Sequence, residues 1–337
     1  MNEPAGVPPE GLVQGKDALA LEAIVAGPSD VKLTAREVQE LELDVVGGAT
    51  LDASLADVAP ARSLAGDAWR RFRRNKLAMA GLFIVVFLLL VGIFGPLLVG
   101  DPAQQGNALN EHPTSLHPFG TDYLGRDVFV RVIYGIRLSL FIGVLATVLE
   151  TLIGILVGAV AGWFRGWADL VLMRVVDIML GIPYLVLALV LVSVLGKGIS
   201  AVIITLAFTA WLQTARVVRA GFLQVRDLEY VEAAQALGVP TRRIILRHVL
   251  PNVFQPVVVL VAVGVGSAIL AEAALSFLGV GVTEPQASLG GMINKSRTFL
   301  SSAPHLLIFP GIAIVLAVLG FLLVGDGLRD ALDVRDT

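Results

Sequence analysis

Six long apolar stretches decide what this chain can fold into. An α-helix needs about 20 apolar residues to cross a hydrocarbon layer about 30 Å thick, because each residue adds about 1.5 Å. Four of the stretches contain no charged residue, and the other two contain one glutamate each. They run over residues 77–100, 138–164, 178–196, 198–215, 253–282 and 306–325. The sequence therefore predicts an all-α membrane protein with six transmembrane helices.

The composition agrees with this prediction. Of the 337 residues, 56% are hydrophobic and only 16% are charged, which is more apolar surface than a soluble core of this size would bury. The chain has no cysteine, which excludes disulfides, thiolate metal sites and cysteine nucleophiles.

The distribution of lysine and arginine predicts the orientation. These residues are retained on the cytoplasmic side of a membrane. If the run WRRFRRNK at residues 69–76 lies inside, the inner flanks of the spans hold 15 of them and the outer loops hold 6. Both termini are therefore expected in the cytoplasm, and so is the loop between the fourth and fifth spans.

An acidic segment precedes the first span. Residues 1–60 contain 11 acidic and 3 basic side chains, and no basic stretch followed by an apolar core marks a signal peptide. We expect residues 1–65 to form a flexible cytoplasmic extension.

The loop EYVEAAQALGVPTRRIILRHVLPN, residues 229–252, is polar although it lies between two apolar spans. Its first part predicts a short helix that ends at Gly238, where glycine can adopt a left-handed conformation. Pro240 suits the first turn of a second, basic helix, and Pro251 is expected to end that helix where the fifth span begins. The sequence predicts a cytoplasmic helix-turn-helix.

The first of these helices carries a face of small residues, namely Ala233, Ala234 and Ala236. Small side chains permit close approach to a groove on another protein. A helix lying flat on the membrane is the alternative, which the arginines favour, but the apolar face is too narrow for good lipid burial. Docking to a protein partner is the preferred interpretation.

This loop resembles the EAA loop of the permease subunits of binding-protein-dependent ABC importers. The matching positions are Glu232, Ala233, Ala234, Gly238, Leu250 and Pro251. His248 stands where the general pattern has isoleucine, and the context RHVLPN is similar to the dipeptide, oligopeptide and nickel branch, the DppC/OppC family. Residues 117–140, 169–183, 271–282 and 303–311 also resemble that branch, so the likeness covers residues 65–335.

The resemblance implies a type I ABC importer (MetI-like) fold. An OppC-like N-terminal region would occupy residues 66–136, with the first span and an external loop, and a permease core residues 137–335. The loop would supply a coupling helix, with Glu232 anchoring it, Ala233 and Ala234 allowing close packing, and Gly238 setting the angle to the next helix.

The partners follow from the same resemblance. No phosphate-binding loop of the Gly-x-x-x-x-Gly-Lys-Ser/Thr type is present, so ATP hydrolysis is expected from separate ATP-binding subunits. A second permease subunit, an external substrate-binding protein and membrane lipid are the other expected partners. No nucleic acid, cofactor, metal or catalytic residue is expected. The expected location is a bacterial inner membrane and the expected substrate a dipeptide or oligopeptide, with nickel or another small solute as alternatives.

Polar residues inside the spans are candidates for pathway or packing roles. Glu272 is expected to face the pathway or to hydrogen-bond a neighbouring helix, and Glu150 is open between substrate contact and packing. Gly154, Gly158 and Gly162, four residues apart, predict a close helix contact. A local ion pair between Arg174 and Asp177, three residues apart, is the simplest role for those two side chains.

Two other function classes compete with the permease interpretation. A secondary transporter or channel would lead us to expect inverted repeats, broken helices and several charges within spans. An intramembrane enzyme would need a motif such as His-Glu-x-x-His, and none occurs. Neither class explains the polar cytoplasmic loop.

Overall fold

The computed structural model describes residues 64–333, which belong to one compact unit that begins at Ser63. The extension expected over residues 1–65 lies outside the described residues, apart from its last two positions. Within residues 64–333 the chain is helical, with no β-strand. The elements are α4 (Leu64–Arg74), α5 (Lys76–Leu98), α6 (Val128–Phe164), α7 (Gly166–Leu180), α8 (Tyr184–Leu195), α9 (Ile199–Arg226), α10 (Glu229–Ala236), α11 (Thr241–Ile244), the π-helical turn η1 (Ile245–Val249), α12 (Leu250–Phe277), α13 (Leu289–Ser296), the 3₁₀ turn η2 (Arg297–Phe299) and α14 (His305–Leu332).

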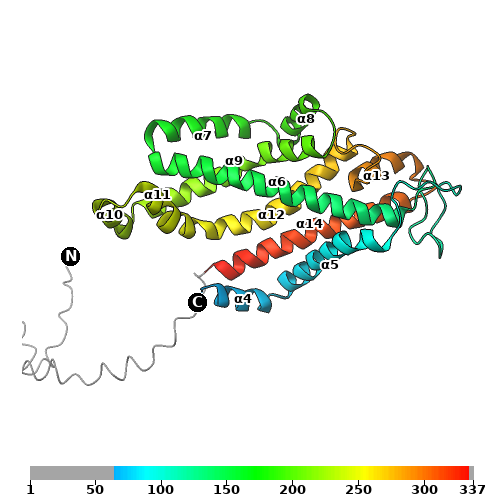
Figure 1. Cartoon of the computed structure of the whole chain (residues 1–337), viewed down its shortest axis with the longest axis horizontal. Coiled ribbons are helices and arrows are strands. Elements are labelled where there is room, and N and C mark those ends of the chain that lie inside the picture. Colours follow the sequence, from blue (N-terminus) through cyan, green and yellow to red (C-terminus); the bar gives the residue numbers. More distant parts are fainter. Residues whose placement is uncertain (1–63, 334–337) are drawn as a thin grey trace, which may run out of the picture. The chain divides into compact units, whose positions relative to one another are not determined.

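The predicted all-α membrane fold is confirmed. In the described part of the chain, five helical stretches are long and apolar enough to cross a membrane, and α7 with α8 makes a sixth if the bent pair counts as one span. Figure 1 shows the long helices α5, α6, α9, α12 and α14 running along a common direction.

The third span differs from the prediction of one helix over residues 178–196. The chain bends by 94° between α7 and α8, at the residues Gly181, Ile182 and Pro183. Proline lacks the N–H that would continue the helix, and it disfavours helical geometry at the residue before it. The break therefore follows from Pro183, although the apolar stretch runs through it.

The seam between α6 and α9 confirms the close contact predicted from the glycine spacing. A side chain at Gly158 would place its Cβ only 2.5 Å from the carbonyl oxygen of Ala215 on α9. Gly154 and Gly162 approach Thr214 and Phe222 in the same way, at 2.6 and 2.5 Å. Only glycine permits two helix backbones to come this close.

Ion pairs between helices fix α7 against α9. Asp177 on α7 accepts a hydrogen bond of 2.6 Å from Arg216 on α9, and Asp169 pairs with Arg219. The local pair expected between Arg174 and Asp177 was therefore wrong, because α9 brings a better-placed guanidinium to Asp177.

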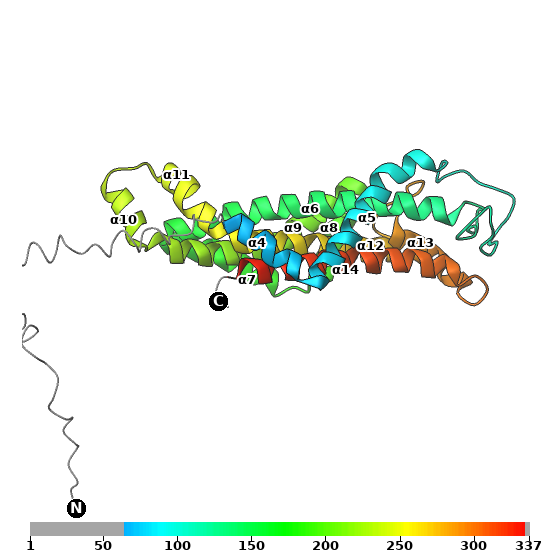
Figure 2. The ribbon, with the colours of Figure 1, turned by 90° about the horizontal axis from the view of Figure 1, so that it is seen from below.

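The loop that carries α10 and α11 and the long loop between α5 and α6 lie at opposite ends of the helices. Figures 1 and 2 show α10 and α11 at one end, and α13 with the long loop between α5 and α6 at the other. The two ends are joined by a continuous helical rod, because α11, η1 and α12 run from Thr241 to Phe277 without interruption.

This rod corrects the prediction of a separate basic helix that ends at Pro251. Pro251 instead lies in the first turn of α12, and the π-helical turn η1 precedes it. The N–H of Leu250 donates to the carbonyl of Ile245 across this turn. A wider turn accommodates a residue that cannot donate to the ordinary helical acceptor.

Candidate functional site

The predicted left-handed glycine after the short polar helix is confirmed. Gly238 has φ +74°, and the N–H of Val239 donates to the carbonyl of Ala234 at 3.1 Å while that of Gly238 donates to Gln235 at 2.9 Å. These bonds close the C-terminal end of α10 with the glycine-dependent motif expected there. Pro240 stands one residue before α11, so the chain reverses over Leu237 to Pro240.

A small apolar core holds α10 against the long helices. Val231 is fully buried and packs in one cluster with Phe222 of α9, Ile244 of α11, and Val249 and Val253 at the start of the rod. Tyr230 adds a polar contact, since its hydroxyl lies 3.3 Å from the amide nitrogen of Asn252. α10 is therefore packed against α9 and the start of the rod.

The outward surface of α10 is acidic and small, with one large apolar residue at its end. Glu232, Ala233 and Ala236 are exposed, and the carboxylate of Glu232 makes no hydrogen bond or ion pair within residues 64–333. Ala234 was expected on the same face of small residues, but it packs against the apolar core that contains Val231. Leu237, which sequence reasoning did not single out, is 84% exposed at the tip.

The remaining two positions of the motif lie where the loop joins the fifth span. Leu250 is half-buried against the core that contains Val231, and Pro251 is exposed. Leu250 therefore lies against the apolar core that holds α10, whereas Pro251 lies on the surface of the rod.

Glu272 has a full set of hydrogen bonds. Three hydroxyls donate to its carboxylate: Ser139 of α6 at 2.9 Å, Ser276 of α12 at 2.8 Å, and Ser288 at the start of α13 at 2.9 Å. The side chain is completely buried. This carboxylate ties three elements together.

Glu150 is in the opposite situation. It is 6% exposed on α6, near Gly264 of α12, and its carboxylate forms no hydrogen bond or ion pair within the described part of the chain. The two candidate glutamates are therefore not brought together into one site.

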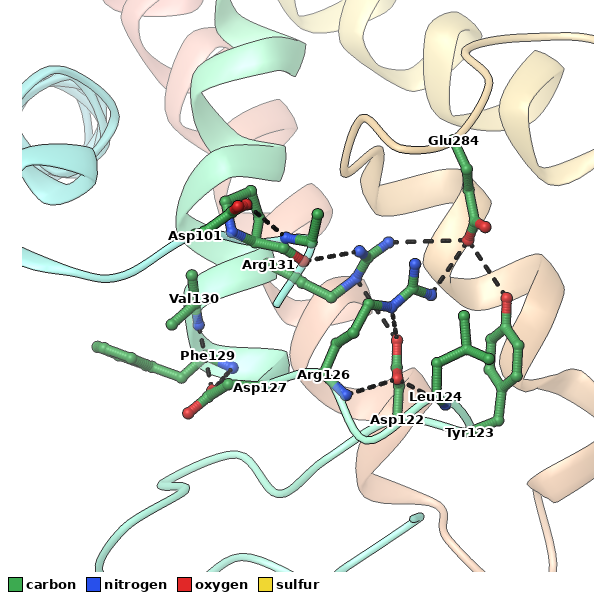
Figure 3. Close-up of polar contacts among 12 residues, drawn as sticks. Asp101, Asp122, Tyr123, Leu124, Arg126, Asp127, Phe129, Val130, Arg131 and Glu284 are labelled. Carbon is green, nitrogen blue, oxygen red and sulfur yellow. Dashed lines mark hydrogen bonds and ion pairs between the residues drawn. The ribbon is translucent and has the colours of Figure 1, made fainter. Parts of the chain in front are cut away.

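At the other end of the bundle, a cluster of charged residues joins two loops (Figure 3). Arg126 donates to Asp122 at 2.7 Å and to Glu284 at 3.1 Å. Arg131, from the first turn of α6, lies 3.6 Å from Asp122 and donates to the carbonyl of Pro102 at 3.0 Å. Both arginine side chains are almost fully buried, so the cluster fixes the loop after α5 and the loop after α12 over the start of α6.

The electrostatics of this cluster favour an ionised Glu284 and a neutral Tyr123. Burial raises the pKa of Glu284, but the hydrogen bond and charge of Arg126, together with the charge of Arg131, hold it below its ordinary value. Burial and the negative charge of Glu284 raise the pKa of Tyr123, whose hydroxyl donates to Glu284 at 3.2 Å. Sequence reasoning missed this cluster, because nothing in the spacing shows that residue 284 returns to residue 126.

Comparison with known proteins gives two family matches. Residues 154–335 match the family described as binding-protein-dependent transport system inner membrane component, and residues 63–118 match the N-terminal TM domain of oligopeptide transport permease C.

Individual relatives cover most of the chain. The dipeptide transport system permease protein DppC of Bacillus subtilis is 43% identical over 82% of this chain and 87% of its own length. The oligopeptide transport system permease protein OppC of the same organism is 42% identical over 81% and 90%, respectively. The glutathione transport system permease protein GsiD of Shigella flexneri is 43% identical over 79% and 89%.

Proposed function

We propose that this chain is the permease subunit of an ATP-driven peptide importer. The premise is that the chain belongs to the family of binding-protein-dependent transport system inner membrane components. Members of this family are permeases of ABC importers, so the chain is a transport component. Its proposed role is to form half of the translocation pathway.

The observation that carries this proposal is the construction of α10. It exposes Glu232, Ala233 and Leu237 at one end of the bundle, while Val231 and the glycine motif at Gly238 fasten it to α9 and to the rod that contains α12. Such a helix can enter a groove on an ATP-binding subunit and pass movement of that subunit to the spans. Glu232 is the proposed polar anchor and Ala233 the close contact.

Peptides are the proposed substrate class. The relatives are named for dipeptide, oligopeptide and glutathione transport, and glutathione is itself a tripeptide. The external substrate-binding protein would dock on the loops that the charged cluster holds together, and both termini would lie in the cytoplasm with α10.

Reconstitution tests the proposal. The chain is co-expressed with the products of its neighbouring genes, and the assembly is placed in liposomes with its binding protein outside and ATP inside. We expect uptake of a radiolabelled dipeptide that requires ATP, and no uptake of nickel ions. Uptake of nickel alone would overturn the substrate class, and peptide uptake driven by an ion gradient without ATP would overturn the ABC mechanism.

A further inference from the structure

One side of α4, the short helix before the first span, is packed against the bundle. Phe72 is almost fully buried, in a cluster that contains Ala331 of α14 and residues of α5. A polar contact holds the helix in the same place, since the guanidinium of Arg71 donates to the carbonyl of Asp333 at 3.1 Å. α4 is therefore fastened to the starting end of α5 and the final end of α14.

The other side of α4 is basic. Arg70, Arg73 and Arg74 are exposed, and so is Lys76 at the start of α5. These four side chains, called the basic surface below, make no ion pair or hydrogen bond with any residue that the structure describes. Asp67 is the one acidic residue of α4. The basic surface therefore carries an excess of positive charge that the described part of the chain does not neutralise.

The length of α5 fixes the depth of the basic surface in a membrane. α5 has 23 residues and no charged side chain after Lys76. At 1.5 Å per residue it is about 35 Å long, against a hydrocarbon layer about 30 Å thick. Lys76 therefore lies at the level of the lipid headgroups, and α4 lies there too, because only Asn75 separates the two helices.

Two exposed apolar side chains lie beside the basic surface. Trp69 of α4 is 52% exposed, and Leu77 in the first turn of α5 is 66% exposed. Tryptophan is enriched where headgroups meet acyl chains, because its ring is apolar and its N–H is polar. A basic helix with an exposed tryptophan at this depth has the composition of a helix that lies in a membrane surface.

We propose that α4 binds anionic phospholipid, with the basic surface donating to the phosphate groups and Trp69 lying between headgroups and acyl chains. Guanidinium groups suit phosphate, because their planar array of N–H groups can donate two parallel hydrogen bonds. Each lysine or arginine near an anionic membrane surface adds to the attraction. The surface therefore selects anionic over zwitterionic lipid, beyond the general preference that sets orientation.

The acidic segment that precedes α4 is another occupant of opposite charge. Residues 1–60 contain 11 acidic and 3 basic side chains. The depth of α4 favours lipid over this segment, because Trp69 and Leu77 are exposed at the level where acyl chains begin. Coverage of α4 by protein is one outcome of the test below.

The absence of cysteine makes a local test available, because a single introduced cysteine reports on its own position. Leu77→Cys is labelled with bimane in the full-length chain, purified with its partner subunits and placed in phosphatidylcholine nanodiscs. The nanodiscs contain a small fraction of phosphatidylglycerol or phosphatidylcholine that carries a doxyl quencher on the same acyl carbon. The matched probe is Leu97→Cys, 78% exposed near the other end of α5.

We expect the phosphatidylglycerol quencher to quench at residue 77 at least twice as strongly as the phosphatidylcholine quencher, and the two to quench equally at residue 97. Replacing Arg70, Arg73 and Arg74 together by glutamine should abolish the preference at residue 77. The fold should persist, because these side chains are exposed and glutamine is a good helix former. The control replaces three other exposed arginines by glutamine, Arg242, Arg243 and Arg247, and should keep the preference.

Equal quenching by the two lipids at residue 77 of the otherwise unchanged chain would overturn the inference. Absence of quenching by either lipid would also overturn it, since α4 would then be covered by the acidic segment or by another subunit. Loss of the preference in the control variant as well would assign it to the total charge of the protein rather than to α4.

Discussion

Individual carboxylates in this protein are distinguished by the donors around them. Glu272 accepts from three serines on three elements, whereas Glu150 has no hydrogen-bond donor within residues 64–333, and Glu284 pairs with arginines outside the spans. The same residue type can therefore hold helices together or fasten a loop. The surrounding donors decide which of these roles each carboxylate has.

Replacement of Glu272 should destabilise the protein. Glu272→Leu leaves the hydroxyls of Ser139, Ser276 and Ser288 without their acceptor in a buried place, and we expect a loss of about 3 kcal/mol in the free energy of unfolding. The measurement is unfolding in mixed micelles, followed by circular dichroism. Glu272→Gln, which keeps an acceptor, should lose less. Equal stability of Glu272→Leu and wild type would contradict the packing role.

The contribution of Glu284 to stability should depend on pH. Its pKa is lower in the folded protein than its ordinary value of 4.5. A carboxyl group with a lowered pKa contributes stability above its unfolded pKa, and this contribution is lost as the pH falls through the folded pKa. The difference in Tm between wild type and Glu284→Gln should therefore be present at pH 7 and should close as the pH falls below 4.5.

The control for this experiment is Glu229→Gln, at an exposed position on α10. Its Tm should follow that of wild type across the same range. If the difference in Tm between wild type and Glu284→Gln stays constant from pH 7 to below pH 4.5, the charge of Glu284 does not hold the loops together.

At the scale of elements, close packing of α6 on α9 depends on the absence of side chains at three positions. The structure places backbone or side-chain atoms of α9 within 2.6 Å of any Cβ at Gly154, Gly158 or Gly162. Overpacking of this kind separates helices and costs more than the gain in helix propensity.

We expect Gly158→Ala to destabilise the protein by about 1–3 kcal/mol. Gly311→Ala is the matched control, since it adds a methyl group to a glycine of α14 that has no atom within 4 Å of the added Cβ. That variant should be as stable as wild type or slightly more stable. Thermal unfolding of the two variants side by side is the measurement, and equal Tm values would mean that the seam can relax.

The sequence predicts the features that depend on local patterns, and it does not predict those that depend on contacts between distant residues. Long apolar stretches and the Gly238 motif are local, so the spans and the reversal after α10 were predicted correctly. The 94° bend at Pro183 was missed, because hydropathy does not register a break inside an apolar stretch. Pairings such as Arg126 with Glu284 and Asp177 with Arg216 join residues far apart in the sequence, and only the fold determines them.

At the scale of the whole molecule, the arrangement connects the two ends of the bundle. α10 is fastened to the rod from Thr241 to Phe277, and Glu272 near the far end of that rod is bonded to Ser288 at the start of α13. In the proposed coupling role, movement at α10 would reach the loops near Glu284 through one helix.

The orientation is testable with two positions of equal exposure. Leu116, in the loop after α5, is 83% exposed, and Leu237 at the tip of α10 is 84% exposed. In intact cells, a membrane-impermeant thiol reagent should label Leu116→Cys, whereas Leu237→Cys should be labelled only after the membrane is permeabilised. The reverse pattern would place α10 outside and remove its coupling role.

The central claim, that α10 docks on ATP-binding subunits, is tested most directly by co-purification. The tagged chain is expressed with the products of its neighbouring genes and purified in mild detergent, as wild type, as Glu232→Arg with Ala233→Arg, and as the control Leu116→Arg. Both α10 substitutions lie at exposed positions, so the fold should persist. We predict that wild type and control recover ATP-binding subunits, and that the α10 variant loses them while it keeps the second permease subunit. Equal recovery of ATP-binding subunits by all three proteins would contradict the account.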